Sequence, residues 1–217
     1  MSDFSTRRVM MVDTQVRPSD VTKFPIIAAM LSVPREDYVP VAQREAAYVG
    51  LNIEYAAGRV VLEPRTLSKL LDFLDISPND HVLDVGAGFG YAAAVLAAMQ
   101  ASVVAVEADA GAAASASAHL AEAGLDGVKF ISGPLHDGAP AEAPYDVILI
   151  EGGVEEVPAA LVGQLKNGGR IGAIFMQGAL GTVRIGLKRD GVVNWRFAFN
   201  ATAPILPGFA AARKFVL

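Results

Sequence analysis

The sequence of 217 residues contains no cysteine, and it has only three histidines and one tryptophan. The missing thiols exclude a disulfide framework, a thiolate zinc site, an iron–sulfur cluster and a cysteine nucleophile. Positive charge is also scarce, because 18 lysines and arginines stand against 23 acidic residues, for a formal net charge of −5. We therefore expect no metal site, and neither nucleic acid nor an anionic membrane as a partner, since both polyanions require basic surface.

Apolar residues are abundant instead, at 53% hydrophobic against 19% charged, which predicts a folded globular chain. Residues 85–106 carry no charge and are long enough to span a bilayer, but glycines and Gln100 divide them into turn, helix and strand. Residues 1–15 have two arginines and no apolar run behind them, so no secretory signal is predicted. The expected location is the cytoplasm, and the sequence leaves the oligomeric state open.

Strand-like and helix-like segments alternate from residue 81 onward. The predicted strands are 81–85, 102–107, 128–131, 145–150 and 170–175, and the predicted helices are 91–100, 110–123 and 157–165. This alternation predicts a parallel sheet covered on both faces. Segments 182–188 and 192–199 then flank Asp190-Gly191, a hairpin signal. The alternating residues of the last segment predict a half-buried strand; they are Val193, Trp195, Phe197 and Phe199.

The first 76 residues have a helical and irregular pattern. A helix is predicted to begin around Ser19-Asp20 and to stop before Pro34, and a short one is predicted over 42–48. The clearest helix carries leucines at i, i+3, i+4 and i+7, starting at Leu67. The predicted fold is α/β: a Rossmann-like, doubly wound, mostly parallel sheet ending in an antiparallel hairpin. Residues 1–76 are predicted to form a helical N-terminal extension, packed on an α/β core over 77–217 as one structural unit.

A glycine-rich turn lies where the first predicted strand ends and the next helix begins. It reads D-x-G-x-G-x-G from Asp84 to Gly90, and Glu107 ends the second strand. Glycines let a ligand approach the backbone there, and a carboxylate in the position of Glu107 can accept both hydroxyls of a ribose. The spacing differs from the dinucleotide pattern G-x-G-x-x-G, and Asp84 suits a cationic ligand better than a pyrophosphate. A nicotinamide or flavin site and a turn used only for packing remain alternatives.

Several blocks resemble one known family in order and spacing. The glycine loop resembles motif I of class I S-adenosylmethionine-dependent methyltransferases. Residues 33–40 (VPREDYVP) with Ala47-Tyr48 are similar to the VPRE-x-F-VP…AY segment of protein-L-isoaspartate O-methyltransferases. Further similar blocks lie at 82–97, 144–148 with Val157-Pro158, and 164–169. The resemblance implies the class I methyltransferase fold and methylation of isoaspartyl carboxylates in damaged proteins, with a protein or peptide as substrate.

The same resemblance implies S-adenosyl-L-methionine as the cofactor. The residues implied to bind it are Asp84, Gly86, Ala87, Gly88, Gly90, Glu107, Ala108 and Leu135. Leu135 follows Gly133-Pro134 where the family has G-D-G, so an acid is absent, although leucine can still cover an adenine.

The sequence departs from the family at the methyl-transfer site. The family's G-Q-T-I-S-Q-P loop aligns with residues 58–64, which places Leu62 at the serine position and Glu63 next to it. The family's T-A-A becomes Glu151-Gly152-Gly153. The catalytic residues therefore stay unassigned. The candidates are Arg59 and Arg65, as bidentate partners of a carboxylate, and Glu151, as a general base.

Each of these three candidates has an ordinary alternative. The two arginines can be solvated surface residues, and Glu151 can be a helix-capping or solvated acid. A methyltransferase with a different acceptor, or an inactive module that binds the cofactor, remains an alternative to the isoaspartyl activity.

Overall fold

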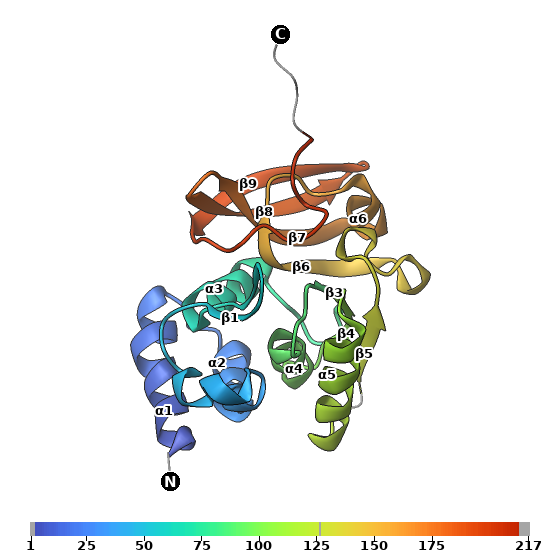
Figure 1. Cartoon of the computed structure of the whole chain (residues 1–217). Coiled ribbons are helices and arrows are strands. Elements are labelled where there is room, and N and C mark those ends of the chain that lie inside the picture. The colour runs from blue at the N-terminus through green and yellow to red at the C-terminus, as the bar shows by residue number, and fades with distance from the viewer. Residues whose placement is uncertain (1–2, 126, 213–217) are drawn as a thin grey trace.

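The computed structural model describes residues 3–125 and 127–212, and a seven-stranded sheet forms its centre (Figure 1). The strands are β3 (His81–Val85), β4 (Ser102–Glu107), β5 (Val128–Ser132), β6 (Tyr145–Val154), β7 (Leu165–Gln177), β8 (Leu180–Arg189) and β9 (Val192–Asn200). Their order is β5-β4-β3-β6-β7-β8-β9, parallel from β5 to β7 and antiparallel beyond. The predicted fold class is confirmed.

Predicted and observed strands agree closely at the start of the sheet and less well towards its end. β3 and β4 have the predicted bounds, because turn residues flank both apolar runs. β6 extends four residues past its predicted end, to Val154. The extension is stabilised by a distant segment: the Gly153 amide donates to the Pro204 carbonyl at 2.8 Å, and the Leu206 amide donates to the Gly153 carbonyl at 2.9 Å.

Helices cover the two faces of the sheet unequally (Figure 1). They are α1 (Phe4–Met11), α2 (Phe24–Ser32), α3 (Pro64–Leu74), α4 (Tyr91–Ala98), α5 (Ala110–Glu122) and α6 (Ala159–Gln164). Buried residues of the first five share one apolar cluster with Val82 of β3. Leu161 of α6 belongs to a second cluster with Leu83, whose side chain points to the opposite face.

The N-terminal segment packs on the sheet but differs in detail from the prediction. The helix placed at Ser19-Asp20 begins instead at Phe24, because Asp20 has a left-handed φ of 67° and Pro25 stands in the first turn of α2. The short helix placed over 42–48 is a 3-10 helix over Val41–Ala46. The leucine-striped helix is confirmed as α3. The boundary between extension and core at residue 76 stays a prediction.

A short antiparallel pair within this segment was not predicted from the sequence. β1 (Ile53–Ala56) and β2 (Arg59–Val61) form a separate two-stranded sheet. Gly58 in the connecting turn has a φ of +69°, a conformation that favours glycine. The pair therefore places residues of the aligned G-Q-T-I-S-Q-P loop on a hairpin.

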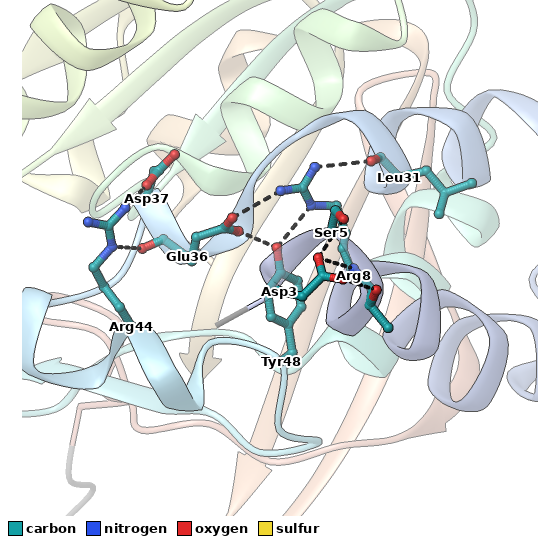
Figure 2. A network of polar contacts seen from close by, with 9 residues as sticks. Asp3, Ser5, Arg8, Leu31, Glu36, Asp37, Arg44 and Tyr48 are labelled. Atoms are coloured by element: carbon teal, nitrogen blue, oxygen red, sulfur yellow. Dashed lines mark hydrogen bonds and ion pairs between the residues drawn. The ribbon is translucent and has the colours of Figure 1, made fainter. Parts of the chain in front are cut away.

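A polar network anchors α1 to the rest of the N-terminal segment (Figure 2). The Arg8 guanidinium donates to the Tyr48 hydroxyl at 2.9 Å and to the Glu36 carboxylate at 3.0 Å. The Tyr48 hydroxyl also donates to Glu36, and burial raises the pKa of Tyr48. Glu36 lies in the VPRE block, so the network connects this block to Arg8 of α1 and to Tyr48.

One part of the predicted alternation in β9 is wrong. Trp195 packs edge-on against Phe175, with ring centroids 4.8 Å apart, and Phe199 is buried against the opposite apolar cluster. Phe197 is 62% exposed, however. Phe197 lies on the same face as Trp195, opposite the exposed Arg184, and Val183 pairs with Phe199, which leaves Ala198 as an extra residue. This bulge changes which face the following side chains point to.

The uncharged run over 85–106 divides as predicted into the end of β3, the helix α4 and the strand β4. Within residues 3–125 and 127–212, no helix is long and apolar enough to cross a membrane.

Candidate functional site

The glycine loop connects β3 to α4 with three residues in left-handed backbone conformations. Gly86, Gly88 and Gly90 have φ values of +86°, +54° and +86°. The amides of Gly86 and Ala87 both donate to the Val106 carbonyl, at 2.9 and 3.3 Å, which fixes the loop against the end of β4. The loop therefore lies at the carboxyl ends of the central strands, where sheets of this class bind ligands.

Glu107 lies directly beside this loop, as the sequence predicts. Its side chain is 1% exposed, and one carboxylate oxygen accepts the Gly88 amide at 2.7 Å. The other oxygen accepts the amides of Ala108 at 2.8 Å and Asp109 at 3.2 Å. Three backbone amides thus hold the carboxylate in place.

Arg59 also binds Glu107, a contact that the sequence did not predict. Its two terminal nitrogens donate to the two carboxylate oxygens at 2.9 and 2.6 Å. Arg59 is 7% exposed, so the interpretation as a solvated residue is wrong. Burial opposes its charge, but the hydrogen bonds to Glu107 together with the nearby Tyr55, Glu107 and Glu151 raise the pKa of Arg59. The partners are 48 residues apart in the chain, and no local pattern connects them.

Two further carboxyl groups lie buried behind the loop. Asp84 is 0% exposed and Glu151 is 4% exposed, so Glu151 is not a solvated acid. Burial raises the pKa of Asp84 to about 7. Burial, and then the charge of Asp84, raise the pKa of Glu151 well above its usual range. Glu151 lies next to Asp84, so the protonation of one group affects the pKa of the other.

Arg35, from the VPRE block, is a fully buried cation that the sequence did not single out as a functional residue. Its Nε donates to the Ala47 carbonyl at 2.7 Å, and its Nη2 donates to the Leu62 carbonyl at 2.8 Å. The guanidinium lies over the Tyr91 ring, 4.7 Å from its centroid. Arg35 thereby links the loop that carries the serine position to the start of α4.

The remaining predicted residues lie in different surroundings. Leu62 is 0% exposed and belongs to the apolar core. Arg65 is half-exposed, with its guanidinium 5.7 Å from the centroid of the Phe199 ring. Leu135 is buried among core residues of the opposite face of the sheet. A cavity of about 590 Å³ lies beside the Leu62 loop, and Glu63 and Asn52 are among its lining residues.

The chemistry of the glycine loop and Glu107 suits a nucleoside with a cationic group. Glu107 is a fixed hydrogen-bond acceptor, and the glycines have no side chains that would keep a ligand from the backbone. In the observed conformation, however, Tyr55 and Arg59 of the β1–β2 hairpin lie over the loop. A Cβ on Gly88 would be 2.8 Å from the Tyr55 hydroxyl. Among the described residues, no group of three acidic, histidine or cysteine side chains could hold a metal ion.

Comparison with known proteins identifies the family. The sequence model of the protein-L-isoaspartate(D-aspartate) O-methyltransferases matches residues 8–178. A protein-L-isoaspartate O-methyltransferase from Methylorubrum populi is 38% identical over 208 residues, covering 94% of this chain and 97% of the relative. One from Koribacter versatilis is 35% identical over 171 residues, covering 79% of this chain and 77% of the relative.

Solved structures agree in fold. A protein-L-isoaspartate O-methyltransferase structure superposes with a TM-score of 0.80 at 24% identity, and the match covers 93% of this chain and 66% of that one. The second structure is a Plasmodium falciparum protein described as a β-aspartate methyltransferase and crystallised with S-adenosyl-L-homocysteine. It superposes with a TM-score of 0.78 at 18% identity, and the match covers 91% of this chain and 97% of that one. With the family model matching most of its length, the chain belongs to the protein-L-isoaspartate O-methyltransferase family.

Proposed function

We propose that this chain is an S-adenosyl-L-methionine-dependent O-methyltransferase that methylates the carboxylate of L-isoaspartyl residues in damaged proteins. The observation that carries the proposal is the contact between the Gly88 amide and the Glu107 carboxylate, at 2.7 Å, in a member of this family. The contact supports a role for Glu107 as acceptor of the ribose hydroxyls, next to a glycine backbone without a Cβ.

The bound cofactor supplies an electrophilic methyl group on a sulfonium, which a carboxylate accepts in one displacement without a base. Glu107 would accept the ribose hydroxyls, and Leu135 would cover the adenine. Asp84 would face the cationic end. The other proposed contacts come from the backbone of Gly86, Ala87, Gly88, Gly90 and Ala108. The task of the chain is therefore to position two ligands and exclude water.

The acceptor side is the part that departs from the family pattern. The Leu62 side chain offers no hydrogen bond to a substrate carboxylate, and Glu63 adds a like charge. Arg65, which is half-exposed in the first turn of α3 directly after this loop, is the proposed partner of that carboxylate, and the cavity beside Glu63 is the proposed peptide groove. Glu151 is 4% exposed, so a hydroxyl or amine acceptor has little access to it as a general base, which favours a carboxylate acceptor that needs no base.

The proposed partner is a protein or peptide that contains an isoaspartyl residue. The net charge of −5 does not favour nucleic acid or an anionic membrane as a partner. The proposed location is the cytoplasm.

The first test measures cofactor binding and turnover on the same sample. We expect titration calorimetry to show binding of S-adenosyl-L-methionine, and an isoaspartyl peptide to be methylated. Gly88→Asp should abolish binding, because its side chain would lie where Tyr55 and the ligand approach the loop. Gly124→Asp is the matched control: Gly124 also has a left-handed φ, of +73°, but its Cβ would meet nothing within 4 Å.

Binding without turnover on isoaspartyl peptides would refute the proposed acceptor and direct attention to another one or to a binding role. Equal binding by the Gly88 and Gly124 variants would refute the assignment of the glycine loop.

A second prediction concerns the serine position. Leu62→Ser should increase isoaspartyl turnover by providing a hydroxyl for the substrate carboxylate. It should also lower stability by about 2–5 kcal/mol, because Leu62 is fully buried. Leu62→Ala, which creates a similar cavity without a hydroxyl, is the control. Equal turnover by the two variants, measured as methyl ester formed, would contradict the role assigned to this position.

A further inference from the structure

The β1–β2 hairpin lies over the glycine loop and contacts it through two side chains. The Tyr55 ring packs against Phe89 of the loop, with centroids 5.2 Å apart. The Tyr55 hydroxyl lies 3.5 Å from Glu107 and close to the Gly88 backbone. Arg59, on the other strand, forms the buried pair with Glu107. The hairpin therefore covers the residues to which we assign the ribose.

Arg59 presents to Glu107 the same pattern of donors that a ribose would present. Its guanidinium directs two parallel N–H groups at the two carboxylate oxygens, and a vicinal diol directs two O–H groups at them. With Arg59 bound, both oxygens also accept backbone amides, so Glu107 has no remaining position for two hydroxyls. The guanidinium and the ribose consequently exclude each other.

The hairpin is built in a way that permits its tip to move. It forms a sheet of its own, without pairing to the seven-stranded sheet, and an isolated two-stranded hairpin is marginally stable. Ala56 and Ala57 at the tip are exposed, whereas Val60 and Val61 are buried in the core. The ion pair with Glu107 is thus a main attachment of the tip, and Val60 and Val61 anchor its base.

We propose that Arg59 is a built-in competitor of the cofactor, so that ribose binding to Glu107 requires the tip of the β1–β2 hairpin to swing away. This inference rests on the proposed function, because it concerns the same cofactor site. Only molecules with an open hairpin bind the cofactor, so the apparent affinity equals the affinity of the open form multiplied by the fraction of molecules that are open. Arg59 stands where the family loop has glutamine, so the competition belongs to this chain's own departure from the family pattern.

The test is calorimetric titration with S-adenosyl-L-homocysteine, which lacks the transferable methyl group. We expect Arg59→Ala to bind it at least about tenfold more tightly than the unaltered chain, because the closed state loses its attachment. Arg17→Ala is the control, since Arg17 forms an exposed ion pair with Asp13, away from the hairpin. Equal or weaker binding by Arg59→Ala would overturn the inference, and weaker binding would make Arg59 a cofactor contact.

Hydrogen exchange on the unaltered chain provides a second measurement that does not depend on the variant folding. Saturating S-adenosyl-L-homocysteine should accelerate amide exchange over residues 54–59, because the tip leaves the loop. Protection or unchanged exchange of these amides would overturn the inference. Absence of binding to both the unaltered chain and Arg59→Ala would instead refute the proposed function, and the inference with it. The two failures are therefore distinguishable.

Discussion

Replacing Arg35 by alanine is expected to lower the free energy of unfolding by about 3 kcal/mol or more. The variant loses two charge-assisted hydrogen bonds, each worth about 1.5–3 kcal/mol, and leaves the carbonyls of Ala47 and Leu62 without their donor. It also loses the stacking of the guanidinium on Tyr91. Urea unfolding at neutral pH measures the change.

The matched control for this experiment is Arg44→Ala, since Arg44 forms an ion pair with Asp37 on the surface and its side chain is 43% exposed. We expect that variant to change stability by less than about 1 kcal/mol. Arg35→Lys should fall in between, because lysine keeps the charge but cannot bridge two carbonyls with a planar fork. Arg35→Ala unfolding within about 1 kcal/mol of the unaltered chain would show that the buried cation is dispensable.

The second large effect is a fall in stability as the pH rises from 5 to 8. The pKa of Asp84 is raised from 3.8 to about 7 by burial, so the unfolded chain gives up this proton more readily than the folded chain. Stability from this group is fully present below pH 3.8 and is lost as the pH rises through 7. Each pKa unit corresponds to about 1.4 kcal/mol, so the loss between pH 5 and pH 8 is about 3 kcal/mol.

Urea unfolding at pH 5, 6.5 and 8 measures this dependence. Asp84→Asn should flatten it, because the amide does not ionise. Glu122→Gln serves as the control, since Glu122 is an exposed acid at the end of α5. If Asp84→Asn and Glu122→Gln follow the same pH curve as the unaltered chain, the raised pKa of Asp84 does not control the pH dependence.

The fold was predictable where local patterns are strong. The bounds of β3 and β4 follow from apolar runs between turn residues, and α3 follows from its leucine stripe. The hairpin β1–β2 was missed because its strands have only four and three residues, too few for alternation to stand out. The change of face between Phe197 and Phe199 was missed because a bulge is fixed by pairing with β8 and not by the sequence of β9 itself.

The site was predictable only as far as the backbone determines it. The glycine loop and Glu107 meet because parallel strands bring their carboxyl ends to one edge of the sheet. The partners of Glu107 and Glu151 come from tertiary packing across the chain, at separations that no periodicity reveals. The sequence could name Arg59 and Glu151 as candidates, but it gave no indication that both are buried or which groups they contact.

The contact between the end of β6 and the segment around Leu206 has a consequence for biosynthesis. Leu206 and Phe209 are 2% and 1% exposed, and they complete the apolar cluster on one face of the sheet. Gly152 leaves the space for Leu206, because a Cβ there would lie 2.5 Å from that side chain. The core on this face therefore stays open on the ribosome until residues 203–209, which follow the last strand of the sheet, have emerged.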